Sequence, residues 1–288
     1  MPAVLKFFFE NRPTNMQMTP RERVLKAFKQ LPGRPDRVPV QFDLCRQLCG
    51  HFCFPDPNAP GRFRDAEALV KKYHDDYLVF GTMEVTVFSL AHQLAGMEKL
   101  LIDMMMETEY VVPLFEACAE FQTQIGLKMI DFGVDAIWFG DDFGTQNSLI
   151  IPPEIFCSQR KPHYKRMVDR FKARKPDVIP ILHCDGAVAE LLSDFSEIGF
   201  EVFNPVQPGI PGHLPQDMKS RFGGEFSFWG AIDQQVLLPH GSDEDLEADI
   251  IEKTNILGKG GGYMIAPAPI IQSDVRSERV GKFAELCI

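Results

Sequence analysis

His183, Cys184 and Asp185 follow directly on the apolar run 178–182, and Gly186 comes next. A short apolar run that ends in polar residues and glycine predicts a buried strand, and α/β barrels carry their chemistry at the carboxyl ends of strands. Imidazole, thiolate and carboxylate groups bind zinc and transfer protons. Because side chains alternate along a strand, we expect His183 and Asp185 to point the same way and Cys184 the other way. His183 and Asp185 are therefore the first candidate metal ligands, with Cys184 as a further one.

The same residues also fit a purely structural interpretation. Asp185 would cap the helix that follows, His183 would be a hydrogen-bonded core residue, and Cys184 would act as a small hydrophobic side chain. The elements around these residues have to decide between the two interpretations.

Strand-like apolar runs alternate along the chain with longer amphipathic runs that are typical of helices. The expected strands are residues 38–43, 77–81, 136–140, 178–182, 202–205, 226–230 and 263–266. The expected helices are one opened by Thr19 and Pro20 and the runs 111–130, 153–174, 187–198, 243–257 and 276–286. Strict alternation predicts parallel βα units, and no glycine-rich phosphate motif follows the first strand as a dinucleotide fold requires. We therefore expect an α/β fold of the (β/α)8 TIM-barrel type.

Polar residues recur where the expected strands end: Asp43, Asp141, Asp142, Gln207 and Asp233. In a parallel barrel these ends form one rim, which is the active face, so the recurrence favours function. Asp142 is expected to be a base or a metal ligand, with Asp141 capping the next helix. Asp233 is expected to be catalytic, with helix capping as its alternative. Gln207 would bind substrate or satisfy loop backbone.

Composition and length narrow the classes of protein. The chain has 288 residues, a net charge of −10 and a pI of about 5.2, which argues against binding of nucleic acid or of an anionic membrane surface. Its seven cysteines lack the spacing of a disulfide framework, which favours a cytoplasmic setting. No run approaches the roughly 20 apolar residues of a membrane span. We expect an N-terminal arm at residues 1–18 and a single barrel domain at residues 19–288.

Several short segments follow one another in a characteristic order: residues 21–25, 35–40, 133–135, 140–146, 183–186, 204–208, 229–233 and 261–272. Together they resemble the uroporphyrinogen decarboxylase superfamily, which includes the corrinoid-dependent methyltransferases. The resemblance covers most of the chain. It implies a (β/α)8 barrel whose central cleft either decarboxylates a porphyrinogen or moves a methyl group to or from a corrinoid protein.

The decarboxylases of this superfamily hold the carboxylates of a tetrapyrrole with an N-terminal arginine cluster, written RQAGR. Here residues 46–50 read RQLCG and keep only the first arginine, Arg46. One guanidinium pairs with one carboxylate in a bidentate fork, so a single arginine is a poor match to a substrate with several. Uroporphyrinogen decarboxylation is therefore the alternative function. Arg46, Asp43 and Gln207 are kept as expected substrate contacts.

The methyltransferases of the superfamily hold zinc with a His-x-Cys or similar pair plus a later ligand. His183 and Asp185 match the paired positions, and a carboxylate favours an oxygen substrate such as a methyl ether over a thiol. Pro269 stands where methyl-ether relatives often carry histidine, and proline does not bind metal. The remaining zinc ligand would then be Asp142, Asp233 or Cys184.

The chain is short in one region. Members of the superfamily normally have several dozen residues between the strand at 77–81 and the segment that resembles residues 88–96. The barrel is therefore expected to be one strand short, or to use residues 85–88 as a merged strand. We expect a zinc-assisted methyltransferase that exchanges a methyl group between a small methyl ether or thiol and a separate corrinoid protein. A non-catalytic binding protein on a shortened barrel is a second alternative, and a homodimer is compatible with the sequence.

Overall fold

The computed structural model describes residues 54–268 and 270–287. Several expected features lie outside these ranges: the arm at residues 1–18, the helix opened by Thr19 and Pro20, the strand at 38–43, Asp43, Arg46 and Pro269. Within them, no helix has both the length and the hydrophobicity of a membrane span.

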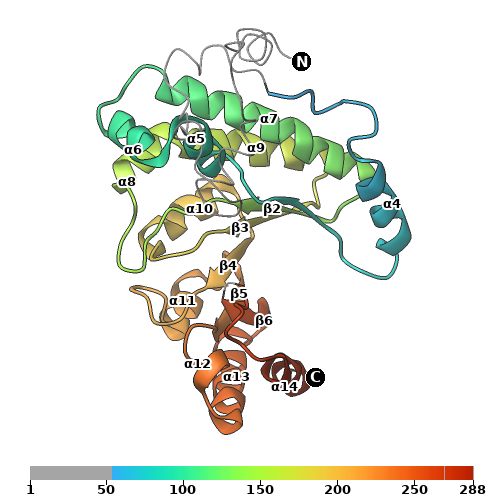
Figure 1. Cartoon of the computed structure of the whole chain (residues 1–288), viewed down its shortest axis with the longest axis vertical. Coiled ribbons are helices and arrows are strands. Elements are labelled where there is room, and N and C mark those ends of the chain that lie inside the picture. The colour runs from blue at the N-terminus through green and yellow to red at the C-terminus, as the bar shows by residue number, and fades with distance from the viewer. Residues whose placement is uncertain (1–53, 269, 288) are drawn as a thin grey trace, which may run out of the picture.

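The described chain alternates strands with helices throughout (Figure 1). The strands are β1 Phe80–Met83, β2 Ala136–Gly140, β3 Ile179–His183, β4 Val202–Val206, β5 Ser227–Asp233 and β6 Tyr263–Ala268. The helices of the first half are α4 Arg64–Tyr73, α5 Phe88–Ala95, α6 Met97–Met105, α7 Val111–Phe132, α8 Pro153–Gln159 and α9 Lys161–Arg174. Those of the second half are the 3-10 helix η1 Ala189–Leu191, α10 Leu192–Ile198, α11 Pro215–Phe222, α12 Leu237–His240, α13 Asp243–Leu257 and α14 Ser277–Leu286.

The strands form one six-stranded sheet in the order β1-β2-β3-β4-β5-β6, and every neighbouring pair is parallel. This sequential order with intervening helices is that of a (β/α) barrel, and it confirms the expected fold class. Among the described residues the sheet is not closed by hydrogen bonds. The expected helix at 153–174 is divided into α8 and α9 at Arg160, because Pro162 in the first turn of α9 has no N–H to continue α8.

The sheet is strongly curled. The ring of Phe80 on β1 lies 5.7 Å from that of Trp229 on β5, although three strands separate β1 from β5 in the sheet order. Trp138 on β2 also contacts Trp229, at 5.0 Å between ring centroids. These contacts cross the concave side, so aromatic side chains occupy the interior that a barrel encloses.

The region between α4 and α7 is short, as the sequence indicates. It contains the single strand β1, after which residues 84–87 form a bend and α5 begins at Phe88. Residues 85–88 therefore supply no merged strand, and that version of the expectation is corrected. The bend packs tightly on the end of β2: a Cβ atom on Gly140 would lie 2.4 Å from the carbonyl oxygen of Glu84. Glycine is required there by the close approach of two backbones.

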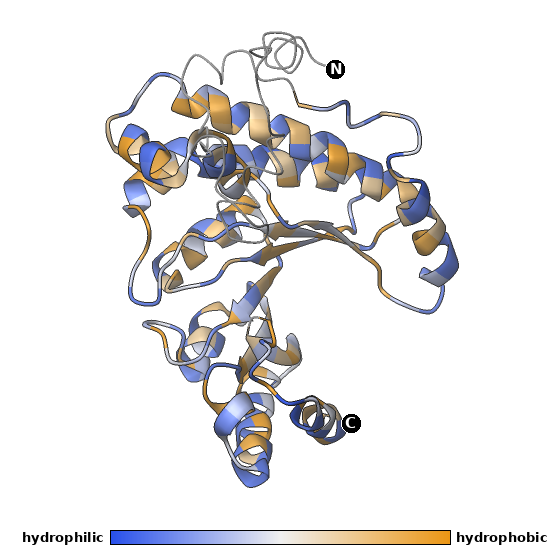
Figure 2. Cartoon of the chain, viewed as in Figure 1, coloured by the Kyte–Doolittle hydropathy of each residue, from blue (hydrophilic) through white to orange (hydrophobic). Residues whose placement is uncertain are grey.

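Most of the buried side chains form one cluster between the sheet and helices α7 to α10, with Phe115, Phe139, Phe171 and Phe195 fully buried. Figure 2 shows both hydrophobic and hydrophilic residues along α7, as expected for a helix with one buried face. A smaller cluster lies near the C-terminus, around Ile232, Leu238 and Leu246.

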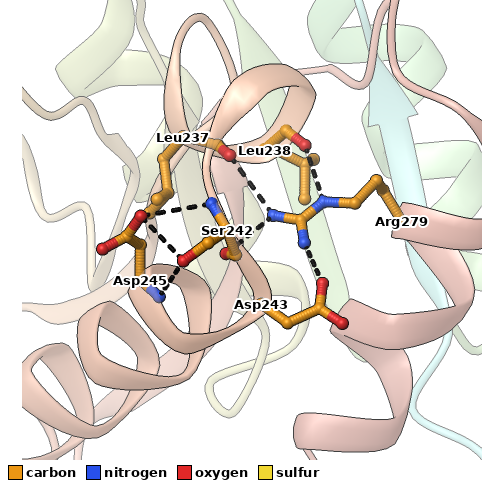
Figure 3. Close-up of polar contacts among 6 residues, drawn as sticks. All are labelled: Leu237, Leu238, Ser242, Asp243, Asp245 and Arg279. Carbon is orange, nitrogen blue, oxygen red and sulfur yellow. Dashed lines mark hydrogen bonds and ion pairs between the residues drawn. The ribbon is translucent and has the colours of Figure 1, made fainter.

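Arg279 fastens α14 to the segment around α12 and α13 (Figure 3). Its Nε donates to the carbonyl oxygen of Leu238 at 3.2 Å, and its Nη2 donates to those of Leu237 and Ser242 at 3.4 and 3.3 Å. Its Nη1 forms an ion pair with Asp243. The side chain is only 6% exposed, so one buried guanidinium donates to three carbonyl groups at the end of the C-terminal core.

Replacement of Arg279 by alanine is expected to lower the free energy of unfolding by about 2 kcal/mol, because the carbonyl oxygen of Leu238 loses its donor and Asp243 loses its ion-pair partner. Chemical denaturation at neutral pH measures this change. Arg276→Ala, at an exposed arginine one turn earlier, is the matched control and should change stability by less than about 0.5 kcal/mol. Equal midpoints for the two variants would show that the Arg279 contacts do not stabilise the fold.

Candidate metal centre

His183, Asp185 and Asp142 come together at the carboxyl edge of the sheet. One ligand atom from each lies within 4.8 Å of the other two. The register pairs Gly140 at the end of β2 with His183 at the end of β3, so the residues that follow the two strands meet at one edge. His183 Nε2 lies 3.9 Å from Asp185 Oδ2, and the backbone N–H of Asp185 donates to Asp142 Oδ1 at 2.9 Å. The sequence analysis expected these three residues to meet at the rim together with Asp233, which is not part of the cluster.

Two residues that the sequence analysis did not single out hold the His183 ring. Its Nδ1 lies 2.7 Å from the side-chain oxygen of Asn204 on β4. Its ring stacks on Trp138 of β2, with 4.9 Å between centroids and 20° between planes. Both residues lie inside strands. An asparagine before a proline is typical of a turn, and a tryptophan in a strand is typical of the core, so neither residue type indicated a functional role.

Asp185 carries an oxygen without a partner. Its Oδ1 is buried and accepts no hydrogen bond from the described residues. Burial raises the pKa of the Asp185 carboxyl to about 6; the nearby His183 lowers it and the charge of Asp142 raises it. A carboxylate in this state is costly unless it gains a proton or a cation.

This donor set fits zinc. Zn²⁺ binds imidazole nitrogen and carboxylate oxygen, and catalytic zinc sites have three protein ligands and one open position. His183, Asp185 and Asp142 offer one nitrogen and two carboxylates, and the unpartnered Oδ1 of Asp185 lacks the compensation that a cation would supply. These three residues are the ones that would hold the metal.

The raised pKa of Asp185 predicts a variant that is more stable than the wild type. The folded-state pKa of about 6 exceeds the ordinary value of about 3.9, so the folded protein binds the proton more tightly and loses stability as the pH rises from about 4 to 6. Asp185→Asn removes this penalty. With chelator present, it should raise the unfolding free energy by about 1–2 kcal/mol near neutral pH, after allowance for partial exposure.

Chemical denaturation as a function of pH checks this expectation, and the gain should shrink as the pH falls toward 4. A metal-free Asp185→Asn protein that is less stable than the wild type at neutral pH would contradict it. Asp169→Asn, at an exposed aspartate on α9, is a control for the amide replacement itself.

Cys184 faces away from this cluster, as strand alternation predicts. It is fully buried, and its sulfur accepts the backbone N–H of Phe143 at 3.3 Å. Burial raises the pKa of the thiol well above its ordinary value. A neutral thiol in the core is a poor zinc ligand, so we leave Cys184 out of the proposed ligand set.

Asp141 has a structural place next to Asp142. Its carboxylate accepts backbone N–H groups from Val87, Phe88 and Ser89 at 2.6, 3.1 and 2.6 Å, and the hydroxyl of Tyr164 also donates to it. Asp141 therefore caps α5, which precedes it in the chain, and not the following helix as the sequence suggested. Because it is only 1% exposed, it has no access to substrate.

Asp233 and Gln207 lie outside the cluster. Asp233 Oδ1 accepts from the backbone N–H groups of Gln235 and Val236 at 2.7 and 3.2 Å. Gln207 is 4% exposed; its Oε1 accepts the backbone N–H of Gly186 at 3.1 Å, and its Nε2 donates to Gln146 at 3.2 Å. These contacts favour the structural alternative for both residues, namely the shaping of the turns that follow the strands.

A sequential parallel sheet with an imidazole–carboxylate cluster at its carboxyl edge defines a (β/α)-barrel type of protein with a strand-end site. The family model described as uroporphyrinogen decarboxylase (URO-D) matches residues 57–287. The chain therefore belongs to the URO-D family, as the sequence resemblance indicated.

A solved structure that matches the chain shares its fold. A methyltransferase from Methanosarcina mazei superposes with a TM-score of 0.70 at 18% sequence identity, covering 88% of this chain and 73% of its own. A xylanase 10C from Cellvibrio japonicus in complex with xylopentaose reaches a TM-score of only 0.43 at 12% identity, over 74% of this chain and 49% of its own. None of the curated protein sequences compared with the chain gives a significant match.

Proposed function

We propose that the protein is a zinc-assisted methyltransferase that exchanges a methyl group between a small methylated substrate and a corrinoid protein. The observation that carries the proposal is the cluster of His183, Asp185 and Asp142 at the carboxyl edge of the sheet. Membership of the URO-D family and the fold shared with an M. mazei methyltransferase support it.

The cluster suits the cleavage of a bond to an oxygen or sulfur atom. Zinc, when bound, supplies a Lewis acid that stabilises the negative charge of the departing alkoxide or thiolate. Two carboxylates among three ligands favour an oxygen substrate, in particular a methyl ether. Asp142 is exposed at the edge of the site and spends only Oδ1 on the backbone of Asp185. When the methyl group moves from the corrinoid to the substrate, the second oxygen of Asp142 is placed to accept the proton that the hydroxyl or thiol loses. In the opposite direction the protonated carboxyl returns that proton to the departing alkoxide or thiolate.

The described residues form the strands and helices of the barrel and the connections between them. A separate partner protein would therefore carry the corrinoid. We propose a cytoplasmic setting, in line with the free thiols of Cys157, Cys184 and Cys287. We also propose an N-terminal arm at residues 1–18, a single domain at residues 19–288 and a homodimeric assembly.

The test is methyl transfer to free cob(I)alamin. In this reaction the methyl group leaves its oxygen or sulfur as a cation equivalent, the cobalt is oxidised from Co(I) to Co(III), and the alkoxide or thiolate takes up a proton. We expect the zinc-loaded protein to form methylcob(III)alamin from a methyl ether, which absorption spectroscopy follows. Failure with a panel of methyl ethers and methylated thiols would contradict the proposal.

Uroporphyrinogen decarboxylation is the second candidate, because the matching family model is described by that activity. It requires neither the metal nor a corrinoid partner. Stepwise loss of carboxylates from uroporphyrinogen, in a chelator-treated sample, would establish it in place of the first. A protein that neither binds zinc nor turns over either substrate would match the non-catalytic alternative.

A further inference from the structure

Asn204 approaches His183 from the neighbouring strand. The β3–β4 register pairs His183 with Asn204, and the side-chain oxygen of Asn204 lies 2.7 Å from His183 Nδ1. The backbone carbonyl of Asn204 accepts the N–H of Cys184 at 2.8 Å, so the ladder fixes the position of the pair. Asn204 is only 5% exposed, which shields this hydrogen bond from competing water.

The hydrogen bond determines which nitrogen of the ring carries the proton. In the structure the amide oxygen of Asn204, which is only an acceptor, faces the ring, so His183 donates from Nδ1. In a neutral imidazole the lone pair then resides on Nε2. Nε2 is the atom that lies 3.9 Å from Asp185 Oδ2, on the side of the cluster. The contact with Asn204 therefore selects the form of the ring that a metal at the cluster would bind.

Trp138 fixes the plane of the same ring. The indole and imidazole planes are 20° apart, with centroids 4.9 Å from each other. Rotation of the imidazole would break this stack as well as the hydrogen bond to Asn204. The edge and the face of the ring are thus both held, and the direction of Nε2 is set without a ligand.

We propose that Asn204 is a positioning residue, which holds His183 in the Nδ1–H form and directs the Nε2 lone pair toward Asp185 and Asp142. The inference rests on the proposed function, because the direction of the Nε2 lone pair matters only if a metal binds at the cluster. The protonation form itself is a property of the metal-free protein, so it is measured separately from zinc binding.

Nitrogen NMR of the histidine side chains tests the first half. In chelator-treated, mildly alkaline samples, with His183 assigned by its absence in His183→Ala, we expect wild-type His183 to carry its proton on Nδ1. Asn204→Asp, which retains an acceptor, should keep that form, whereas Asn204→Leu should shift His183 toward the Nε2–H form. Gln159→Leu is the matched control, because Gln159 is another buried amide, 6% exposed, whose partner is the carbonyl of Met104.

Zinc competition with a chromophoric chelator tests the second half. Asn204→Leu should weaken zinc binding by about 10–100-fold, while Asn204→Asp binds as tightly as the wild type or more so. Gln159→Leu should leave the affinity unchanged. Asn204→Ser, which is too short to reach the ring, replaces Asn204→Leu if the leucine variant does not fold.

A wild-type His183 with its proton on Nε2 would overturn the inference, as would an Asn204→Leu protein with unchanged protonation form and zinc affinity. The wild type could bind no zinc while the Asn204→Leu variant loses the Nδ1–H form of His183. In that case the positioning role stands and the proposed metal function fails. The two failures are therefore distinguishable.

Discussion

Replacing Asp141 by alanine is expected to lower the free energy of unfolding by about 3–5 kcal/mol, whereas the same change at its neighbour Asp142 should cost less than about 1 kcal/mol. Asp141 accepts three backbone N–H groups at the start of α5 and the hydroxyl of Tyr164, all in buried surroundings. Without it the backbone N–H groups of Val87 and Ser89 lose their acceptor, and that of Phe88 keeps only the hydroxyl of Tyr164 at 3.4 Å. Asp142 accepts one backbone N–H at the surface.

The loss of Asp141 would also affect a buried cation. The guanidinium of Arg160 is fully buried and lies 3.7 Å from the ring centroid of Phe88. Burial lowers the pKa of Arg160 to about 10, and the charge of Asp141 opposes that shift. Removal of the Asp141 charge leaves this cation with less compensation, which adds to the expected destabilisation.

Thermal and chemical denaturation of the two variants, with zinc titration of each, separate the roles. Asp141→Ala should fold poorly, while Asp142→Ala should melt near the wild-type temperature and bind zinc at least about tenfold more weakly. The two adjacent aspartates serve as controls for each other. The reverse pattern, with Asp142 required for the fold and Asp141 for zinc, would refute the assignment.

His183→Ala is expected to weaken zinc binding by at least about 100-fold, because it removes the only nitrogen ligand of the cluster among the described residues. The fold should tolerate the change, since the side chain forms one hydrogen bond, to Asn204, and one ring stack, on Trp138. A zinc titration with a competing chelator measures the loss. His240→Ala, at an exposed histidine after β5, is the matched control. Equal zinc affinities for these two variants would place the metal elsewhere.

The strands of the barrel were largely predictable because each one is a short apolar run bounded by polar residues. Every strand expected within the described ranges is present. The period of two also placed His183 and Asp185 on one side and Cys184 on the other. Alternation is a local property of an extended chain, so it can be derived without knowledge of the tertiary structure.

The curl of the sheet and the roles of neighbouring acids were not predictable in this way. The contact of Phe80 with Trp229 depends on the accumulated twist of the intervening strands, which no local pattern encodes. Asp141 and Asp142 are alike in sequence, but one points into the core and caps a helix that precedes it. Capping rules consider the helix that follows, so they gave the wrong helix for Asp141.

The most direct test of the account is X-ray absorption spectroscopy at the zinc edge, on protein whose metal content has been measured. The account predicts one zinc per chain with only nitrogen and oxygen ligands at about 2.0–2.2 Å, lost in His183→Ala. A sulfur ligand at about 2.3 Å would bring Cys184 or another cysteine into the site, and a wild-type protein that retains no zinc would contradict the metal centre altogether.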